Sequence, residues 1–192
     1  MKLYFKYDVG LVCKRILEEQ LEKLQLSYSL IGFGEVEIKE LEESGKLKVL
    51  QENLSHFGIE ILESQKSILV QKTKDAIVEM VFMDESLPSS KISAYLAGKL
   101  NYSYGYIFNL FSEVTFTSIE NYIILQKIER AKQLLATGEL NVTEIAYKLN
   151  YSSVAHFSNQ FKNTIGLTPS TFQRIIKKKR SIKKEADNSV NI

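Results

Sequence analysis

The sequence predicts an α+β half followed by an all-α half that contains two helix-turn-helix units. Three observations support this: a succession of strands and helices before residue 64, a five-residue stretch that occurs twice after residue 90, and a change of charge. Residues 1–86 contain eleven Lys or Arg and sixteen Asp or Glu, which gives a net charge of −5. Residues 87–192 contain fourteen Lys or Arg and seven Asp or Glu, which gives a net charge of +7. The expected divisions are a first domain at 1–63, a connecting helix and linker at 64–89, a helical domain at 90–176 and a disordered basic tail at 177–192.

The first domain is expected to follow the order βαββαβ. Its elements are a strand at 2–8, a helix at 11–24, strands at 28–31 and 35–40, a helix at 46–57 and a strand at 58–62. That order is the ferredoxin-like arrangement, in which a four-stranded antiparallel sheet carries two helices on one face. A helix at about 66–82 and the segment ESLPSS at 85–90 are expected to connect it to the helical domain.

The helical domain contains the segment KLNYS twice, at Lys99–Ser103 and at Lys148–Ser152. The residues around the two copies match in kind over about twenty positions, with one extra residue in the second copy. Their apolar spacing predicts a helix, a tight turn and a second helix in each copy. The turn positions are Asn101 and Asn150, and Asn tolerates the left-handed conformation that ends a helix.

A serine after each turn is expected to cap the second helix, namely Ser103 in the first copy and either Ser152 or Ser153 in the second. The segment between the copies predicts one long helix over 118–136, which Gly138 ends. Such a helix is about 28 Å long. Two units joined by it could enter successive major grooves on one face of DNA, about 34 Å apart.

Residues 90–174 resemble the AraC/XylS family of bacterial transcription regulators. The residues that carry the resemblance lie in the second unit, EIAYKLNYSSVAHFSNQFKNTIGLTPSTFQR, which is similar to the family's pattern of IA, F, F-K, G-x-T-P, an aromatic residue and Arg. The resemblance implies a regulator that binds double-stranded DNA. The family usually has Gly where this chain has Asn150, and this change is conformationally mild. The family often has Arg where this chain has Asn109 and Asn159, so a different base preference is expected.

One side of the second helix in each unit is expected to face DNA. The residues expected to face bases are Tyr104, Gly105, Phe108, Asn109, Ser112, Ser153, Val154, Ala155, Ser158, Asn159 and Lys162. The residues expected to contact phosphates are Ser103, Lys148, Ser152, Ser170 and Arg174. Asn can bond bidentately to adenine, and Phe or Ala can contact a thymine methyl, so this surface predicts a preference for A·T pairs. A solvated surface without base contact is the alternative for each residue.

Beyond DNA, a second copy of the chain and RNA polymerase are candidate partners, because the low Arg content of both helices predicts modest affinity for one chain. No run of eighteen apolar residues is present, and the N-terminus lacks the features of a signal peptide. We therefore expect no membrane partner and a cytoplasmic location. The single cysteine fits a reducing compartment.

The segment GLVCKRI, which contains Cys13, resembles the loop of the heavy-metal-associated domain that holds a soft ion with two cysteines. Here Ile16 stands at the second position, and one thiolate cannot supply two soft ligands. We therefore predict no metal and no cofactor, with Cys13 as a weak candidate only. The alternative function is a metal-handling or protein-interaction adaptor. An enzyme is not expected, because the sequence has no nucleophile motif and no Gly-rich phosphate loop.

Overall fold

The computed structural model describes Leu3, Phe5 and residues 9–32, 34–39, 44–82 and 91–189 of the 192-residue chain. The chain divides into two compact units, Met1–Ser64 and Gln65–Ile192. Each unit has a hydrophobic core of its own residues. Across the described ranges, no helix combines the length and the apolar character needed to cross a membrane.

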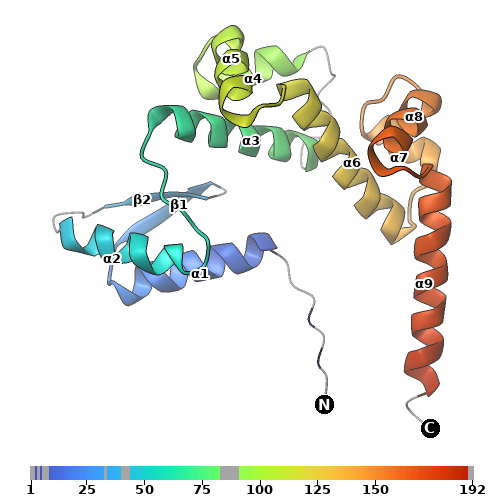
Figure 1. Cartoon of the computed structure of the whole chain (residues 1–192), viewed down its shortest axis with the longest axis horizontal. Coiled ribbons are helices and arrows are strands. Elements are labelled where there is room, and N and C mark those ends of the chain that lie inside the picture. Colours follow the sequence, from blue (N-terminus) through green and yellow to red (C-terminus); the bar gives the residue numbers. More distant parts are fainter. Residues whose placement is uncertain are drawn as a thin grey trace. The chain divides into compact units, whose positions relative to one another are not determined.

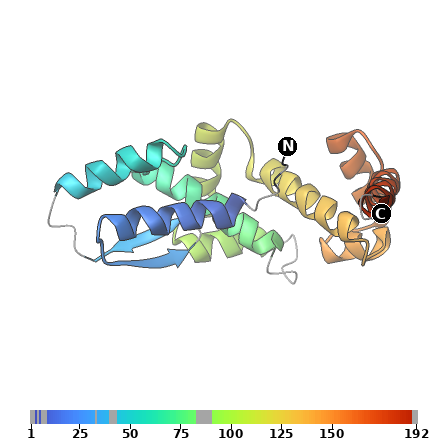
Figure 2. The same cartoon turned by 90° about the horizontal axis from the view of Figure 1, so that it is seen from below.

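The N-terminal unit consists of two helices on one face of a two-stranded sheet (Figures 1 and 2). Its elements are α1 (Val9–Lys23), β1 (Tyr28–Gly32), β2 (Glu35–Ile38) and α2 (Ser44–Ser55). The strands pair antiparallel with Tyr28 opposite Ile38, and the register shifts between Leu30 and Gly32, beside the turn. The buried core residues of this unit are Leu21, Leu26, Leu50 and Leu54.

The four-stranded ferredoxin-like sheet is not confirmed. The segment 58–62, expected to be a strand, forms no ladder; Gly58 has φ 71°, and the amide of Ile59 donates to the carbonyl of Leu54 at 3.1 Å. Ile59 and Ile61 of this segment pack against the core, and no strand among the described residues pairs with the segment, so its alternation reflects burial. Of the strand expected at 2–8, only Leu3 and Phe5 are described, and neither lies in a strand.

The regular elements of the C-terminal unit are all helices within its described residues. Its helices are α3 (Gln65–Phe82), α4 (Ile92–Leu100), α5 (Tyr104–Thr115), α6 (Ile119–Thr137), α7 (Val142–Lys148), α8 (Val154–Ile165) and α9 (Pro169–Ser189). The two predicted helix-turn-helix units are therefore present, as α4–α5 and as α7–α8. The predicted long helix between them is α6, which ends at Gly138 with φ 77°.

Helix α6 contributes to two hydrophobic cores. Ile119 and Ile123, near its start, belong to the core of the first helix-turn-helix unit. Ile128, Ala131 and Leu135, further along, belong to the core of the second. Figure 1 shows α4 and α5 beside the first part of α6, and α7 and α8 beside its last part. One continuous helix therefore connects the two units and packs against both.

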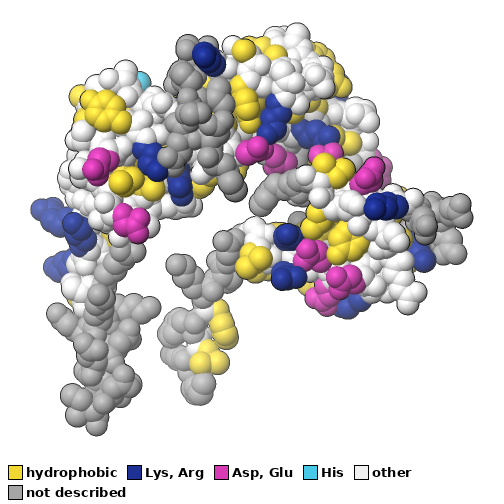
Figure 3. Space-filling model, turned by 180° about the vertical axis from the view of Figure 1, so that it is seen from behind, with side chains coloured by type: hydrophobic (Ala, Val, Ile, Leu, Met, Phe, Trp, Pro, Cys, Tyr) yellow, Lys and Arg dark blue, Asp and Glu magenta, His cyan; other side chains and the backbone are white. Residues whose placement is uncertain are grey.

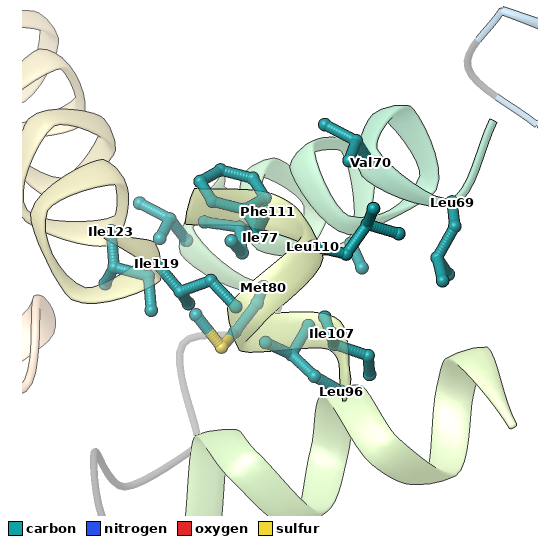
Figure 4. Close-up of a cluster of buried hydrophobic side chains, with 12 residues drawn as sticks. Leu69, Val70, Ile77, Met80, Leu96, Ile107, Leu110, Phe111, Ile119 and Ile123 are labelled. Atoms are coloured by element: carbon teal, nitrogen blue, oxygen red, sulfur yellow. The ribbon is translucent and has the colours of Figure 1, made fainter. Parts of the chain in front are cut away.

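Helix α3 belongs to the first helix-turn-helix unit, although the sequence suggested a connecting helix outside it. Figure 4 shows its side chains in one cluster with those of α4, α5 and α6: Leu69, Val70, Ile77, Met80, Leu96, Ile107, Leu110, Phe111, Ile119 and Ile123. The two compact units divide between Ser64 and Gln65, so α3 falls in the C-terminal unit. The expected linker at 85–90 lies outside the described residues.

The C-terminal segment differs from the disordered tail expected at 177–192. Helix α9 begins at Pro169 and continues to Ser189. The high density of charge suggested disorder, but Lys, Arg, Glu and Ala are all good helix formers, and they dominate this segment.

Candidate nucleic-acid interface

The turn of each helix-turn-helix unit has the backbone geometry that the sequence predicts. Asn101 has φ 57° and Asn150 has φ 54°, so both lie in the left-handed region that Asn tolerates. In the first unit Ser103 caps α5, accepting a hydrogen bond from the amide of Tyr106 at 3.3 Å. In the second, Ser153 rather than Ser152 is the cap and accepts from the amide of His156 at 3.1 Å.

The exposed side of α5 is only partly the one expected. Its exposed residues are Gly105, Tyr106, Asn109, Glu113 and Val114. Gly105 and Asn109 were predicted to face bases and are exposed. Tyr104 and Phe108 are half-buried against the first core, and Ser112 is half-buried with its Oγ enclosed. Tyr106, which is 47% exposed, was not among the residues expected to face bases.

A contact with α6 explains this difference. The hydroxyl of Tyr104 donates to Oε1 of Glu120, at the start of α6, with a distance of 2.8 Å. Burial, together with the hydrogen bond and the negative charge of Glu120, raises the pKa of Tyr104 to about 12. The ring of Phe108 lies next to that of Tyr104, with centroids 6.2 Å apart. The side of α5 that carries Tyr104 and Phe108 is thus partly covered, and the exposed side is shifted toward Tyr106.

Helix α8 has the more polar of the two exposed surfaces. Its exposed residues are Ala155, His156, Asn159, Lys162, Asn163 and Thr164. Ala155, Asn159 and Lys162 were predicted to face bases and are exposed, as is the cap Ser153. Val154 is half-buried against the second core, and Ser158 is half-buried. His156, like Tyr106, is exposed and was not among the residues expected to face bases.

Most of the residues expected to contact phosphates lie on the surface. Ser103, Ser152, Ser170 and Arg174 are exposed, and Lys148, in the last turn of α7, is half-buried. Lys177, Lys178 and Lys179 on α9 are also exposed. Figure 3 shows a dark blue group of Lys and Arg side chains on the C-terminal helix. These residues place hydroxyl groups on both helix-turn-helix units and cationic groups on the second unit and α9.

The two units differ in charge near their exposed helices. Helix α5 contains no Lys or Arg, and its Glu113 is 3.7 Å from the amine of Lys66 on α3. Lys99, the first residue of the first KLNYS copy, bonds to Glu79 at 2.6 Å, and that bond is the main cause that raises the pKa of Lys99. Positive charge is therefore concentrated on the second unit and α9, which suits phosphate contact there.

The N-terminal unit shows no metal-binding cluster within the residues that the structure describes. Cys13 is exposed on α1, and no group of three or more His, Cys, Asp or Glu side chains comes together in those ranges.

Two helix-turn-helix units built on one shared helix place the C-terminal unit in the class of tandem helix-turn-helix domains. Residues 96–175 match the family described as "Helix-turn-helix domain". This match overlaps residues 90–174, which carry the resemblance to the AraC/XylS family.

The relatives match over this part of the chain. The Msm operon regulatory protein of Streptococcus mutans is 36% identical over 81 residues, which are 42% of this chain and 29% of that protein. The raffinose operon transcriptional regulatory protein of Pediococcus pentosaceus is 28% identical over 110 residues, 57% of this chain and 40% of that protein. The chain thus covers less than half the length of either regulator. Both are named as regulatory proteins of an operon.

A similar solved structure is the C-terminal domain of AraT, a response regulator from Geobacillus stearothermophilus. The two sequences are 26% identical, and the match covers 58% of this chain and 88% of the AraT domain, with a TM-score of 0.49.

Proposed function

We propose that this protein is a sequence-specific DNA-binding transcription regulator of the AraC type. In this proposal α5 and α8 are the recognition helices, and each enters a major groove of the same duplex. The observation that carries the proposal is the repeated unit itself: two capped helices, each after a left-handed Asn turn, present exposed polar side chains from a domain of known family.

The length of α6 fits this arrangement. Its 19 residues span about 28 Å, and successive major grooves on one face of B-DNA are about 34 Å apart. Because α6 packs in both cores, the spacing of the two recognition helices is set by one element. A single chain would then recognise a site with two half-sites about one helical turn apart.

The two kinds of contact are assigned to different residues. Asn109 and Asn159 occupy equivalent exposed positions on α5 and α8, and each can bond bidentately to adenine. Ser170, Arg174 and the lysines of α9 are proposed to contact phosphates, which gives affinity without sequence information. Binding should therefore weaken steeply as salt rises.

For the N-terminal unit we propose a role in contacts between protein chains. Helix α1 carries apolar Leu11 and Val12 on its surface, and Phe57 is exposed after α2. The first candidate partner is a second copy of the chain, because a dimer would add recognition helices where each chain has few Arg residues to contact DNA. The other candidate partner is RNA polymerase. Sedimentation of the chain with and without Leu11→Ser and Val12→Ser would test self-association.

DNA binding is tested by titrating the full chain into fluorescently labelled duplexes of genomic sequence at several salt concentrations. We expect salt-dependent binding to all duplexes and tighter binding to a few of them. Asn159→Ala should weaken binding to the preferred duplexes much more than to random sequence. Absence of binding to any duplex at low salt would contradict the proposal, and equal losses on both kinds of duplex would contradict the role of Asn159.

A further inference from the structure

The tyrosine of each KLNYS copy contacts an exposed ring on the recognition helix that follows it. In the first unit Tyr102 stacks on Tyr106, with centroids 5.5 Å apart and planes at 25°. In the second, Tyr151 meets His156 edge-on, with centroids 5.4 Å apart and planes at 84°. The repeat therefore preserves a contact between a turn residue and a helix residue, although the ring on the helix changes from phenol to imidazole.

The two rings occupy the same place in their helices. Tyr106 and His156 are each the third residue, and the backbone amide of each donates to the cap serine of its helix. Residues near the N-terminus of a recognition helix are those that contact base edges in helix-turn-helix complexes. Both side chains are exposed. Each ring thus stands at a base-contacting position on a backbone that is fixed by a cap.

We propose that Tyr106 and His156 are the specificity-determining residues that make the two half-sites different, with Tyr102 and Tyr151 as their positioning residues. This inference rests on the proposed function. The equivalent Asn109 and Asn159 give both half-sites a shared adenine, so the base pairs beside it are distinguished by the two rings.

The chemistry of the rings assigns each half-site its neighbouring base. Tyr106 presents an apolar ring face, which packs against a thymine methyl as Phe does. His156 Nδ1 lies 3.1 Å from Oγ of Ser152. A Ser152 hydroxyl that donates to Nδ1 places the ring hydrogen on Nε2, and that group can donate to O6 of guanine, an acceptor that adenine lacks. The half-site of α5 is therefore assigned thymine beside its adenine, and the half-site of α8 is assigned guanine.

The two positioning tyrosines differ in burial, and this difference makes one of them testable. Tyr151 is 6% exposed and belongs to the second core, where its ring also contacts Phe157, so its loss would unfold the unit. Tyr102 is 46% exposed and lies outside the first core cluster. A change at Tyr102 therefore reports on the orientation of Tyr106 with little effect on folding.

The first experiment selects preferred sites from random DNA with the full chain, with Tyr106→His and with His156→Tyr. We expect His156→Tyr to change the guanine of the α8 half-site to thymine. Tyr106→His should remove the preference for thymine in the α5 half-site, where the residue four positions earlier is Tyr102 rather than a serine like Ser152. The shared adenine should stay in both. Variants that select the same site as the parent chain would overturn the inference while leaving the proposed function intact. If the parent chain itself selects no site, the proposed function fails.

The second experiment measures specific and random-sequence affinity for Tyr102→Ala and Tyr102→Phe. Tyr102→Ala removes the stacked ring and should lower the ratio of specific to random affinity by about tenfold, the size of one lost base contact. Tyr102→Phe keeps the ring and should leave the ratio unchanged. Melting temperatures of both variants should match that of the parent. An unchanged ratio in Tyr102→Ala, or equal losses for both kinds of DNA, would overturn the positioning role.

Discussion

The hydroxyl of Tyr104, the first residue of recognition helix α5, donates a hydrogen bond of 2.8 Å to the carboxylate of Glu120 in the first turn of α6. This bond joins a helix proposed to contact DNA to the helix that both helix-turn-helix units share. It also covers the side of α5 on which Phe108 lies. The orientation of the first recognition surface therefore depends on a contact made outside the repeated unit.

Removing this bond should lower the stability of the domain. Tyr104→Phe deletes the hydroxyl and leaves Glu120 exposed to water, so the expected loss in free energy of unfolding is about 0.5–1.5 kcal/mol. Urea unfolding followed by circular dichroism measures it. Tyr106→Phe is the matched control, because it removes a hydroxyl from an exposed tyrosine on the same helix. Equal stability changes in the two variants would contradict the role of the bond.

Stability should fall between pH 10 and pH 12. The pKa of Tyr104 and that of Tyr151 are each raised from 10.0 to about 12, Tyr151 by burial alone. The folded state therefore holds two protons that the unfolded chain releases in this window, so the free energy of unfolding decreases as pH rises through it and is unaffected below pH 10. Tyrosinate absorbance during an alkaline titration, compared with Tyr151→Phe, checks this. All tyrosines ionising together near pH 10 in the folded protein would refute it.

The C-caps of α5 and α8 should respond oppositely to substitution. Phe116 has φ 55° and is 94% exposed, whereas its equivalent in the second unit, Gly166, has φ 81°. In the folded state, the left-handed conformation costs a residue other than Gly about 1–2 kcal/mol. Gly avoids this cost but loses more conformational entropy on folding, which costs about 0.5–1 kcal/mol. Phe116→Gly should raise the stability by about 0.5–1 kcal/mol and Gly166→Ala should lower it by about 1 kcal/mol. Thermal melts of both variants test this, and the same sign for both would count against it.

A fragment that begins at Gln65 should fold, and one that begins at residue 91 should not fold its first unit. Helix α3 supplies Leu69, Val70, Ile77 and Met80 to the first core, so its removal exposes that core to water. Circular dichroism and hydrogen exchange on the two fragments measure the difference. A cooperative melt of the shorter fragment that equals that of the longer one would show that α3 is not part of the domain.

The sequence predicted the repeated units well because their information is local. The left-handed Asn101 and Asn150, the cap Ser103 and the helix end at Gly138 follow from neighbouring residues, and the structure has all of them. The exposed side of α5 could not be derived in the same way. It depends on Tyr104 meeting Glu120 from another helix, a tertiary contact that periodicity does not reveal.

The errors in the rest of the fold have the same origin. The alternation at 58–62 suggested a strand, but Ile59 and Ile61 pack against a core without strand pairing. Helix α3 was expected as a connecting helix because nothing in its sequence identifies which core buries its apolar residues. Aligning the two helix-turn-helix units with a gap for the extra residue of the second would have shown that Tyr106 and His156 are equivalent, since each is the third residue of its helix.

We propose that one chain places α5 and α8 in successive major grooves of one duplex. Hydroxyl-radical footprinting of the full chain on its selected site, with the number of bound chains determined by sedimentation, tests it most directly. We expect one chain to protect two segments about one helical turn, or 10 base pairs, apart on the same face of the DNA. Protection of a single segment per chain, or of segments on opposite faces, would contradict it.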